Sequence, residues 1–183
     1  MPPDLYPEAL RAEIDEVADL VYRDVNNGVY RCGFAGSQDA YDAAFDSLFA
    51  RLDWLEERLA TRRYLVGDTI TEADVRLFTT LARFDAVYHG HFKCNRGLLT
   101  SFPALWGYAR DLFTTPGFGD TIDFVQIKQH YYLVHTDINP TRIVPKGAGP
   151  VRLAHPPART GRARWPAVRG RHSTAPPSPP CDR

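Results

Sequence analysis

Histidine and cysteine side chains are the residues of this sequence whose types could hold a metal ion or act as a nucleophile. His89, His91 and Cys94 lie within six residues of one another, a spacing that could contribute to a zinc site. A structural zinc ion is normally held by four ligands, and no fourth ligand lies nearby in the sequence. We therefore predict no metal site here, and expect a loop whose polar groups hydrogen-bond to the backbone.

The three cysteines, Cys32, Cys94 and Cys181, lack the pattern of a redox or nucleophilic site. None belongs to a Cys-x-x-Cys pair, and none is followed by proline. A reactive thiolate needs an electropositive or helix N-terminal setting, and the sequence places neither Cys32 nor Cys94 in one. We expect no catalytic cysteine, no disulfide framework and a reducing, cytoplasmic compartment.

The string Thr71-Glu72-Ala73-Asp74 predicts the start of a helix rather than a catalytic carboxylate. The Thr71 hydroxyl can accept a hydrogen bond from the Asp74 N–H, while the Asp74 carboxylate accepts one from the Thr71 N–H, as in a capping box. We therefore assign Thr71 and Asp74 a structural capping role. Loss of Asp74 should cost on the order of 1 kcal/mol or more.

Helical periodicity extends over most of the first 146 residues. Apolar residues recur at spacings of three and four in five segments, which predicts amphipathic helices over about 8–26, 37–59, 71–87, 103–115 and 120–135. The first helix should end at Asn26-Asn27-Gly28, because asparagine and glycine tolerate the left-handed conformation of a helix C-cap. Five helices with short connections and no strand-like alternation predict an all-α bundle.

Composition divides the chain into two parts. The 183 residues have a net charge of zero, and no apolar run approaches the about 18 residues of a membrane span. Residues 1–146 carry 15 basic and 21 acidic groups, whereas residues 147–183 carry 7 basic groups, 1 acidic group and 8 of the 15 prolines. We predict a folded domain over 1–146 and a disordered tail over 147–183. We expect no nucleic-acid partner, because the folded part is acidic and the tail lacks interleaved aromatic residues.

Longer strings resemble one protein family. Leu65-Val66-Gly67-Asp68, followed by the cap at Thr71, is similar to the C-terminal helical domain of the glutathione S-transferases. A more specific resemblance, to the glutathionyl-hydroquinone reductases or Xi class of that superfamily, lies in Asn27-Gly28-Val29-Tyr30, Arg83-Phe84-Asp85-Ala86-Val87-Tyr88, His130-Tyr131-Tyr132 and Ile138-Asn139-Pro140-Thr141-Arg142-Ile143-Val144-Pro145. The resemblance covers about residues 4–147.

The resemblance implies the substrate-binding domain of an enzyme that uses glutathione to reduce glutathionyl-hydroquinones to hydroquinones. In this family a cysteine of a Cys-Pro-Trp-Ala motif, on an N-terminal thioredoxin-like domain, forms a mixed disulfide with glutathione. Three tyrosines of the helical domain line the hydroquinone pocket, and by motif these are Tyr30, Tyr88 and Tyr131. A phenol can hydrogen-bond to a quinol oxygen, stack against its ring, and act as a general acid if its pKa is lowered. The family usually forms homodimers.

Neighbouring residues receive smaller roles. His130 and Arg31 are candidate secondary residues of the pocket. Lys128 and Arg83 are predicted to be surface or interhelical charges rather than substrate ligands. Tyr132 should point away from the pocket, because adjacent residues on a helix are about 100° apart.

The sequence departs from the family at both ends. It contains no Cys-Pro-Trp-Ala motif, so we expect a truncated form that has little or no reductase activity alone. Without a thioredoxin-like domain, apolar or aromatic surface around Tyr30 and Tyr131 should be exposed, which favours dimerisation or limited solubility. From about residue 150 the sequence no longer follows the family, and we hypothesise that this stretch arises from a frameshift. The alternative function is a non-catalytic helical module for dimerisation and protein binding.

Overall fold

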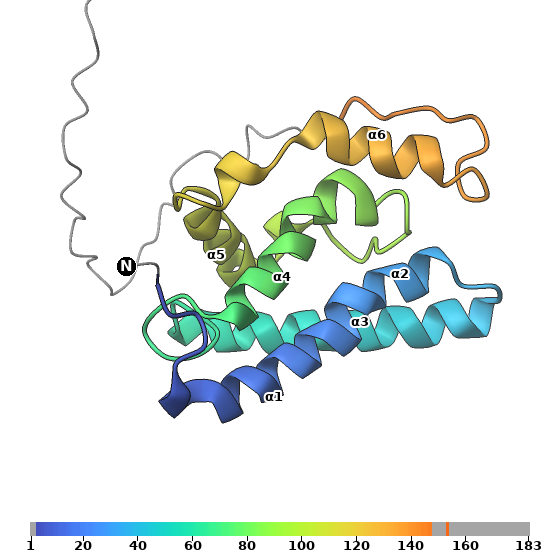
Figure 1. Cartoon of the computed structure of the whole chain (residues 1–183). Helices are drawn as coiled ribbons and strands as arrows, with labels where there is room; N and C mark the ends of the chain where they lie inside the picture. The colour runs from blue at the N-terminus through green and yellow to red at the C-terminus, as the bar shows by residue number, and fades with distance from the viewer. Residues whose placement is uncertain (1–2, 148–152, 154–183) are drawn as a thin grey trace, which may run out of the picture.

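The structure, a computed structural model, describes residues 3–147 and residue 153. Over these residues it is helical and contains no strand, which confirms the predicted all-α bundle (Figure 1). None of the helices in this described part is long and apolar enough to cross a membrane. The α-helices are α1 (Arg11–Val21), α2 (Asn27–Gly33), α3 (Gln38–Thr61), α4 (Glu72–Arg83), α5 (Pro103–Phe113) and α6 (Phe124–Val134).

Five short helical turns complete the described chain. Three of them are 3-10 turns: η1 (Glu8–Leu10), η4 (Leu99–Ser101) and η5 (Gly119–Thr121). The other two are π-helical turns: η2 (Tyr22–Asn26), which joins α1 to α2, and η3 (Phe84–Tyr88), which extends α4. Each π-helical turn widens the helix locally, and such turns often occur at functional sites.

The first helix continues past its predicted end at Asn26-Asn27-Gly28. Asn26 and Asn27 keep right-handed helical backbone angles, and the chain runs through η2 into α2 without a break. The Asn26 amide donates hydrogen bonds to the Arg76 carbonyl (3.0 Å) and the Thr80 hydroxyl (2.6 Å), both on α4. Gly28 is buried against α3. The prediction of a helix end is therefore wrong, because these residues make tertiary contacts instead of a cap.

The other helix starts follow from local capping. The Ser37 hydroxyl accepts a hydrogen bond from the Ala40 N–H (3.2 Å) at the start of α3, and Pro103 occupies the first turn of α5. Thr71 and Asp74 form a capping box at the start of α4. The last helix begins after Asp123, later than predicted, because the Asp123 carboxylate accepts hydrogen bonds from the first backbone N–H groups of α6.

Asp74 also joins three elements in the interior. Its fully buried carboxylate accepts hydrogen bonds from the Leu65 N–H (2.9 Å), the Thr71 N–H (2.8 Å) and hydroxyl (2.9 Å), and the Tyr108 hydroxyl of α5 (2.8 Å). Burial raises the pKa of Asp74 even though these hydrogen bonds lower it. The carboxylate thus holds the loop before α4, the start of α4 and α5 in one arrangement.

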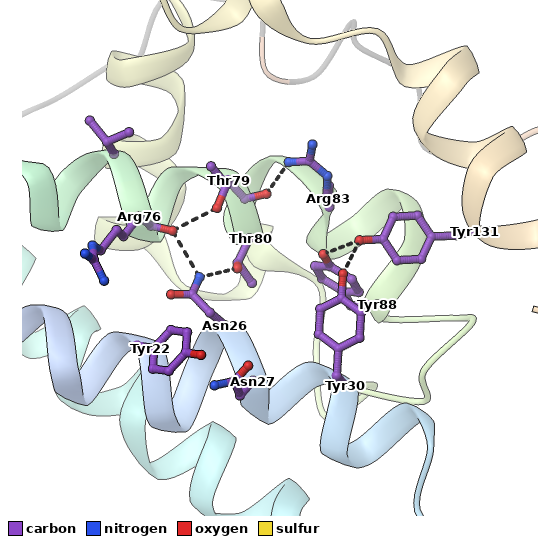
Figure 2. A pocket seen from close by; sticks show the side chains of 11 residues that line it. Tyr22, Asn26, Asn27, Tyr30, Arg76, Thr79, Thr80, Arg83, Tyr88 and Tyr131 are labelled. Carbon is purple, nitrogen blue, oxygen red and sulfur yellow. Dashed lines mark hydrogen bonds between the residues drawn. The ribbon is translucent and has the colours of Figure 1, made fainter.

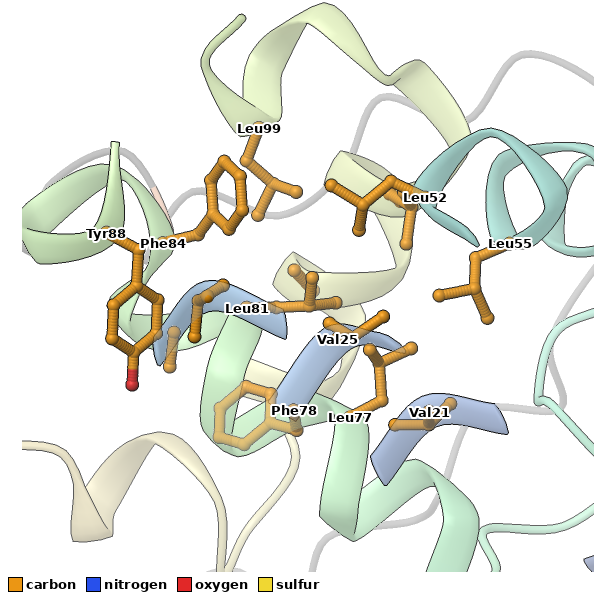
Figure 3. Close-up of a cluster of buried hydrophobic side chains, with 14 of the residues drawn as sticks. Val21, Val25, Leu52, Leu55, Leu77, Phe78, Leu81, Phe84, Tyr88 and Leu99 are labelled. Atoms are coloured by element: carbon orange, nitrogen blue, oxygen red, sulfur yellow. The ribbon is translucent and has the colours of Figure 1, made fainter. Parts of the chain in front are cut away.

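The core surrounds α4. Figure 1 shows α4 between α6 on one side and α1, α2 and α3 on the other. Figure 3 shows how side chains from four parts of the chain meet there: Val21, Val25, Leu52, Leu55, Leu77, Phe78, Leu81, Phe84 and Leu99. Tyr88 lies at one end of this cluster with its hydroxyl directed out of it. The core therefore fixes the ring of Tyr88 and leaves its hydroxyl for another contact.

The chain after α6 folds back along that helix. Lys128 is buried, and its ammonium group donates hydrogen bonds to the carbonyls of Pro145 (3.3 Å), Lys146 (3.2 Å) and Gly147. The prediction that Lys128 is a surface or interhelical charge is therefore wrong. The predicted tail, and with it the frameshift hypothesis, lies outside the described residues except for Gly147 and Leu153, whose side chain is buried.

Candidate functional site

Three tyrosine hydroxyls from distant parts of the chain meet at one point. Tyr30 comes from α2, Tyr88 ends η3 and Tyr131 lies on α6. The Tyr131 hydroxyl lies 2.5 Å from that of Tyr30 and 2.8 Å from that of Tyr88, so it is hydrogen-bonded to both (Figure 2). The structure thus brings together the three tyrosines singled out in the sequence, and we call them the tyrosine cluster.

The tyrosine cluster has one hydroxyl proton to spare. Three phenols carry three O–H donors, and the two internal hydrogen bonds use two of them. Tyr88 and Tyr131 are buried, whereas Tyr30 is 38% exposed. The remaining donor is therefore presented to a ligand most readily at Tyr30, with Tyr88 donating to Tyr131 and Tyr131 donating to Tyr30.

The electrostatics keep these phenols protonated. Burial, together with hydrogen bonding to Tyr30, raises the pKa of Tyr131 to about 12. Burial, together with hydrogen bonding to Tyr131, also raises the pKa of Tyr88 far above its ordinary value. The lowered pKa that general-acid catalysis would favour is therefore not present at either residue. Both are suited to donating hydrogen bonds at neutral pH.

The tyrosine cluster forms one end of an open cleft of about 510 Å³ between the η2–α2 segment and α4. The cleft combines phenol rings with amide, hydroxyl and guanidinium groups, and its lining residues are Tyr22, Asn26, Asn27, Tyr30, Val75, Arg76, Thr79, Thr80, Arg83, Tyr88 and Tyr131. Figure 2 shows Tyr22, Asn26 and Tyr30 below α4 and the three phenols gathered at one end. An aromatic molecule with hydroxyl groups matches this mixture of surfaces.

Arg83, predicted to be a surface or interhelical charge, lies on the surface of this open cleft, and its place in the lining was not predicted. Sequence reasoning missed it because Arg83 is the last residue of α4, where helical periodicity alone does not show which neighbour a long side chain meets. The one available signal was that the family-like string Arg83-Phe84-Asp85-Ala86-Val87-Tyr88 begins at Arg83.

Phe92 supports the tyrosine cluster from behind. Its fully buried ring lies 5.2 Å from the ring of Tyr30, 5.5 Å from that of Tyr88 and 5.8 Å from that of Tyr131, measured between centroids. Gly33 allows this position, because a Cβ atom on residue 33 would lie 2.2 Å from the Phe92 ring. The glycine of α2 is thus a steric requirement of the site.

A histidine pair lies beside the tyrosine cluster. His91 Nε2 and His135 Nδ1 are 3.1 Å apart, and the His135 ring lies 5.5 Å from that of Tyr131. Burial, with the nearby His135, lowers the pKa of His91 to about 4, and burial also lowers the pKa of His135. The prediction that the polar groups of this loop bond to the backbone is wrong for the His91 ring.

The sequence predicts no metal site at His89, His91 and Cys94, which belong to the loop that carries His91 of the histidine pair. Over the described residues, no group of three histidine, cysteine, aspartate or glutamate side chains could hold a metal ion. Cys32 and Cys94 are both buried, and the Cys94 sulfur lies 3.9 Å from the Val29 carbonyl oxygen. Cys181 lies outside the described residues.

The secondary candidates do not line the cleft. His130 contacts the Tyr131 ring edge-on at 5.3 Å from the far side, and Arg31 donates a hydrogen bond to the Arg23 carbonyl (2.8 Å). Tyr132 packs on His91 with ring centroids 4.5 Å apart, which confirms that it points away from the cleft.

Exposed aromatic surface is present on one side of the tyrosine cluster. Tyr30 is 38% exposed, Phe34 52% and Tyr22 55%, whereas Tyr131 is buried. The expectation of open apolar or aromatic surface is therefore met around Tyr30, and near Tyr131, which is itself buried, Val134 of α6 is 60% exposed.

Comparison with known proteins gives one consistent result. The family model for the glutathione S-transferase C-terminal domain matches residues 38–111. The chain is 52% identical over 147 residues to the glutathionyl-hydroquinone reductase PcpF of Sphingobium chlorophenolicum, a match that covers 80% of this chain and 47% of PcpF. It is 48% identical over 144 residues to the glutathionyl-hydroquinone reductase YqjG of Escherichia coli, covering 79% of this chain and 44% of YqjG. The chain thus spans about half the length of these curated relatives.

Solved structures agree. A glutathione transferase from Gordonia bronchialis is 76% identical and superposes with a TM-score of 0.83, over 84% of this chain and 48% of the other. The glutathione-bound structure of E. coli YqjG gives 45% identity and a TM-score of 0.83, over 87% and 51%. The Xi glutathione transferase of Phanerochaete chrysosporium gives 54% identity and a TM-score of 0.79, over 81% and 51%.

Proposed function

Because the chain belongs, through its helical domain, to the glutathionyl-hydroquinone reductases or Xi-class glutathione transferases, we propose that its cleft binds the hydroquinone part of a glutathionyl-hydroquinone. The observation that carries this proposal is the meeting of three tyrosine hydroxyls at one end of the cleft. Tyrosines that only fill a protein core are expected to be buried together. Here the hydrogen-bonded group is buried except for Tyr30, which is exposed to the cleft.

The residues of the cleft have complementary tasks in this proposal. The Tyr30 hydroxyl, polarised by the chain of hydrogen bonds behind it, donates to a quinol oxygen. The tyrosine rings, backed by Phe92, offer aromatic surface to the quinol ring. The raised pKa values of Tyr88 and Tyr131 keep these two phenols protonated, so they act as neutral hydrogen-bond donors behind Tyr30.

In the overall reaction, a glutathionyl-hydroquinone and glutathione give hydroquinone and glutathione disulfide. The carbon–sulfur bond of the substrate breaks, a sulfur–sulfur bond forms, and the ring carbon gains the proton lost by the thiol. The 183 residues contain no Cys-Pro-Trp-Ala motif, and Cys32 and Cys94 are buried away from the cleft. We therefore assign binding and orientation of the hydroquinone to this chain, in a homodimer of the reducing cytosol, and expect a thioredoxin-like domain to supply the reactive cysteine.

Binding of hydroquinone to the 183-residue chain tests the proposal. Anaerobic calorimetric titration should show saturable binding, and Tyr30→Phe should weaken it about 3- to 10-fold because one hydrogen bond to the ligand is lost. Tyr22→Phe is the matched control. Tyr22 lines the same cleft, and its hydroxyl has no hydrogen bond within the described residues, so that variant should bind like the wild type.

Two other results would redirect the assignment. Saturable binding that is insensitive to Tyr30→Phe would refute the role of the tyrosine cluster. Absence of hydroquinone binding would favour the alternative, a non-catalytic helical module for dimerisation and protein binding. Turnover of glutathionyl-menadiol by the chain alone, at the rate of a full-length relative, would refute the expectation that the reactive thiol lies outside these residues.

A further inference from the structure

The charged residues that line the cleft all carry the same sign. Among the described residues of its lining, Arg76 and Arg83 are charged and no carboxylate is present. Residues 1–146 as a whole carry more acidic than basic groups, whereas the charged residues in the described lining of the cleft are both basic. Such a local excess of positive charge favours a negatively charged ligand.

The two arginines differ in how their charge is compensated. Arg76 forms a salt bridge with Glu72, to which its Nε (2.9 Å) and Nη2 (2.5 Å) both donate. Arg83 Nη1 donates to the Thr79 carbonyl oxygen (2.6 Å), and within the described residues no carboxylate pairs with Arg83. A guanidinium group has five N–H donors in a planar fork, so Arg83 keeps donors free for a ligand.

The position of Arg83 lets it act together with the tyrosine cluster. Arg83 ends α4, and η3, which follows directly, ends at Tyr88. Figure 2 shows the Arg83 side chain over the same end of the cleft as the three phenols, held by the Thr79 carbonyl. The positive charge of Arg83 also reaches Tyr131, whose pKa it lowers against the larger effect of burial.

We propose that Arg83 determines specificity in this cleft by pairing with a carboxylate of the ligand while Tyr30 holds the quinol oxygen. This inference rests on the proposed function and names the substrate class more closely: hydroquinone adducts that present a carboxylate toward the end of α4. The carboxylate could come from the quinol ring or from the glutathionyl arm. In either case Arg83 supplies a charge-assisted, potentially bidentate hydrogen bond that a neutral hydroquinone cannot receive.

Three probes separate the sources by anaerobic calorimetric titration of the 183-residue chain. They are hydroquinone, 2,5-dihydroxybenzoate, which adds a ring carboxylate, and glutathione, which carries carboxylates but no quinol. If the ring supplies the carboxylate, 2,5-dihydroxybenzoate should bind about 10-fold more tightly than hydroquinone. If the glutathionyl arm supplies it, that preference should be absent and glutathione should bind measurably.

The variants assign the effect to Arg83. Arg83→Gln should weaken binding of the preferred carboxylate probe much more than binding of hydroquinone. Arg83→Lys should restore part of the binding of the carboxylate probe, because a charge returns without the planar fork. Arg62→Gln is the control, since Arg62 lies outside the cleft lining and pairs with Glu13 (3.0 Å), and it should bind the probes like the wild type. The melting temperature of each variant shows that the fold is intact.

The outcomes distinguish this inference from the proposed function. If hydroquinone binds through Tyr30 but neither carboxylate probe depends on Arg83, the specificity inference is wrong and the function stands. If a carboxylate probe binds through Arg83 while hydroquinone does not bind, the proposed function is wrong. The inference that Arg83 and Tyr30 bind one ligand together is then wrong as well. Equal effects of Arg62→Gln and Arg83→Gln would overturn the assignment to Arg83.

Discussion

Replacing Tyr131 with phenylalanine is the sharpest perturbation of the tyrosine cluster, because its hydroxyl is the one bonded to both others. The change removes two hydrogen bonds, of 2.5 Å to Tyr30 and 2.8 Å to Tyr88. The Tyr30 hydroxyl can turn to water, but Tyr88 is 2% exposed, and its hydroxyl loses its partner inside the protein. A buried group left without a partner costs about 1–3 kcal/mol, so we expect Tyr131→Phe to lower the free energy of unfolding by about 2 kcal/mol or more.

The other two members should cost less, in a defined order. Tyr88→Phe removes one hydrogen bond and leaves Tyr131 bonded to Tyr30, which should cost about 1 kcal/mol. Tyr30→Phe leaves the Tyr88–Tyr131 bond intact at a position that water can reach, which should cost about 0.5 kcal/mol. The structure therefore predicts the order Tyr131, Tyr88, Tyr30, from the largest loss to the smallest.

Urea denaturation followed by far-ultraviolet circular dichroism measures these differences on the 183-residue chain. Tyr22→Phe serves as the reference, because Tyr22 is 55% exposed and its substitution should leave the stability unchanged. If Tyr131→Phe were no more destabilising than Tyr30→Phe, the shared-hydroxyl arrangement would be refuted. Equal losses for all three variants would also contradict it.

Asp74→Ala should lower the free energy of unfolding by about 3 kcal/mol, because its buried carboxylate accepts four hydrogen bonds. A loss below about 1 kcal/mol in urea denaturation would mean that Asp74 contributes no more than an exposed N-cap residue does. Acidification from pH 6.5 to about 4 should destabilise the fold by about 1–3 kcal/mol, because the pKa of His91 falls from 6.5 to about 4 on folding and the unfolded chain takes up the proton first. Melting curves should show this loss in the wild type and less of it in His91→Gln, and equal pH profiles would exclude His91 as the cause. Gly33→Ala should cost about 1–3 kcal/mol because its methyl group would meet Phe92, whereas Gly36→Ala, with open space around it, should not; similar melting temperatures for the two variants would contradict the steric reasoning.

Local signals in the sequence were sufficient to predict most of the helices. Ser37, Thr71 and Pro103 start helices through contacts within one turn, so the residue types alone indicate the boundary. Asn26-Asn27-Gly28 has the residue types of a helix end, yet Asn26 bonds to α4 and Gly28 packs on α3. Those partners lie far away in the sequence, so no local pattern could reveal them.

The site shows the same division between local and distant information. Tyr30, Tyr88 and Tyr131 were identified through the family resemblance, because no periodicity relates residues on α2, η3 and α6. The place of Arg83 in the cleft and the pairing of His91 with His135 were not predicted. Each depends on which helix end meets which loop, and a single sequence does not contain that information.

The two π-helical turns tie the geometry of the cleft to the exact number of residues in a helix. Of the tyrosine cluster, Tyr30 lies one helical turn after η2 and Tyr88 is the last residue of η3. Removing one residue from Tyr22–Asn26 would let regular α-helical hydrogen bonds replace the π-helical turn, because the widened turn is what accommodates the additional residue. The number of residues in this turn is therefore part of the geometry of the cleft, since a deletion that makes the helix more regular would redistribute the residues of the turn, of which Tyr22 and Asn26 line the cleft.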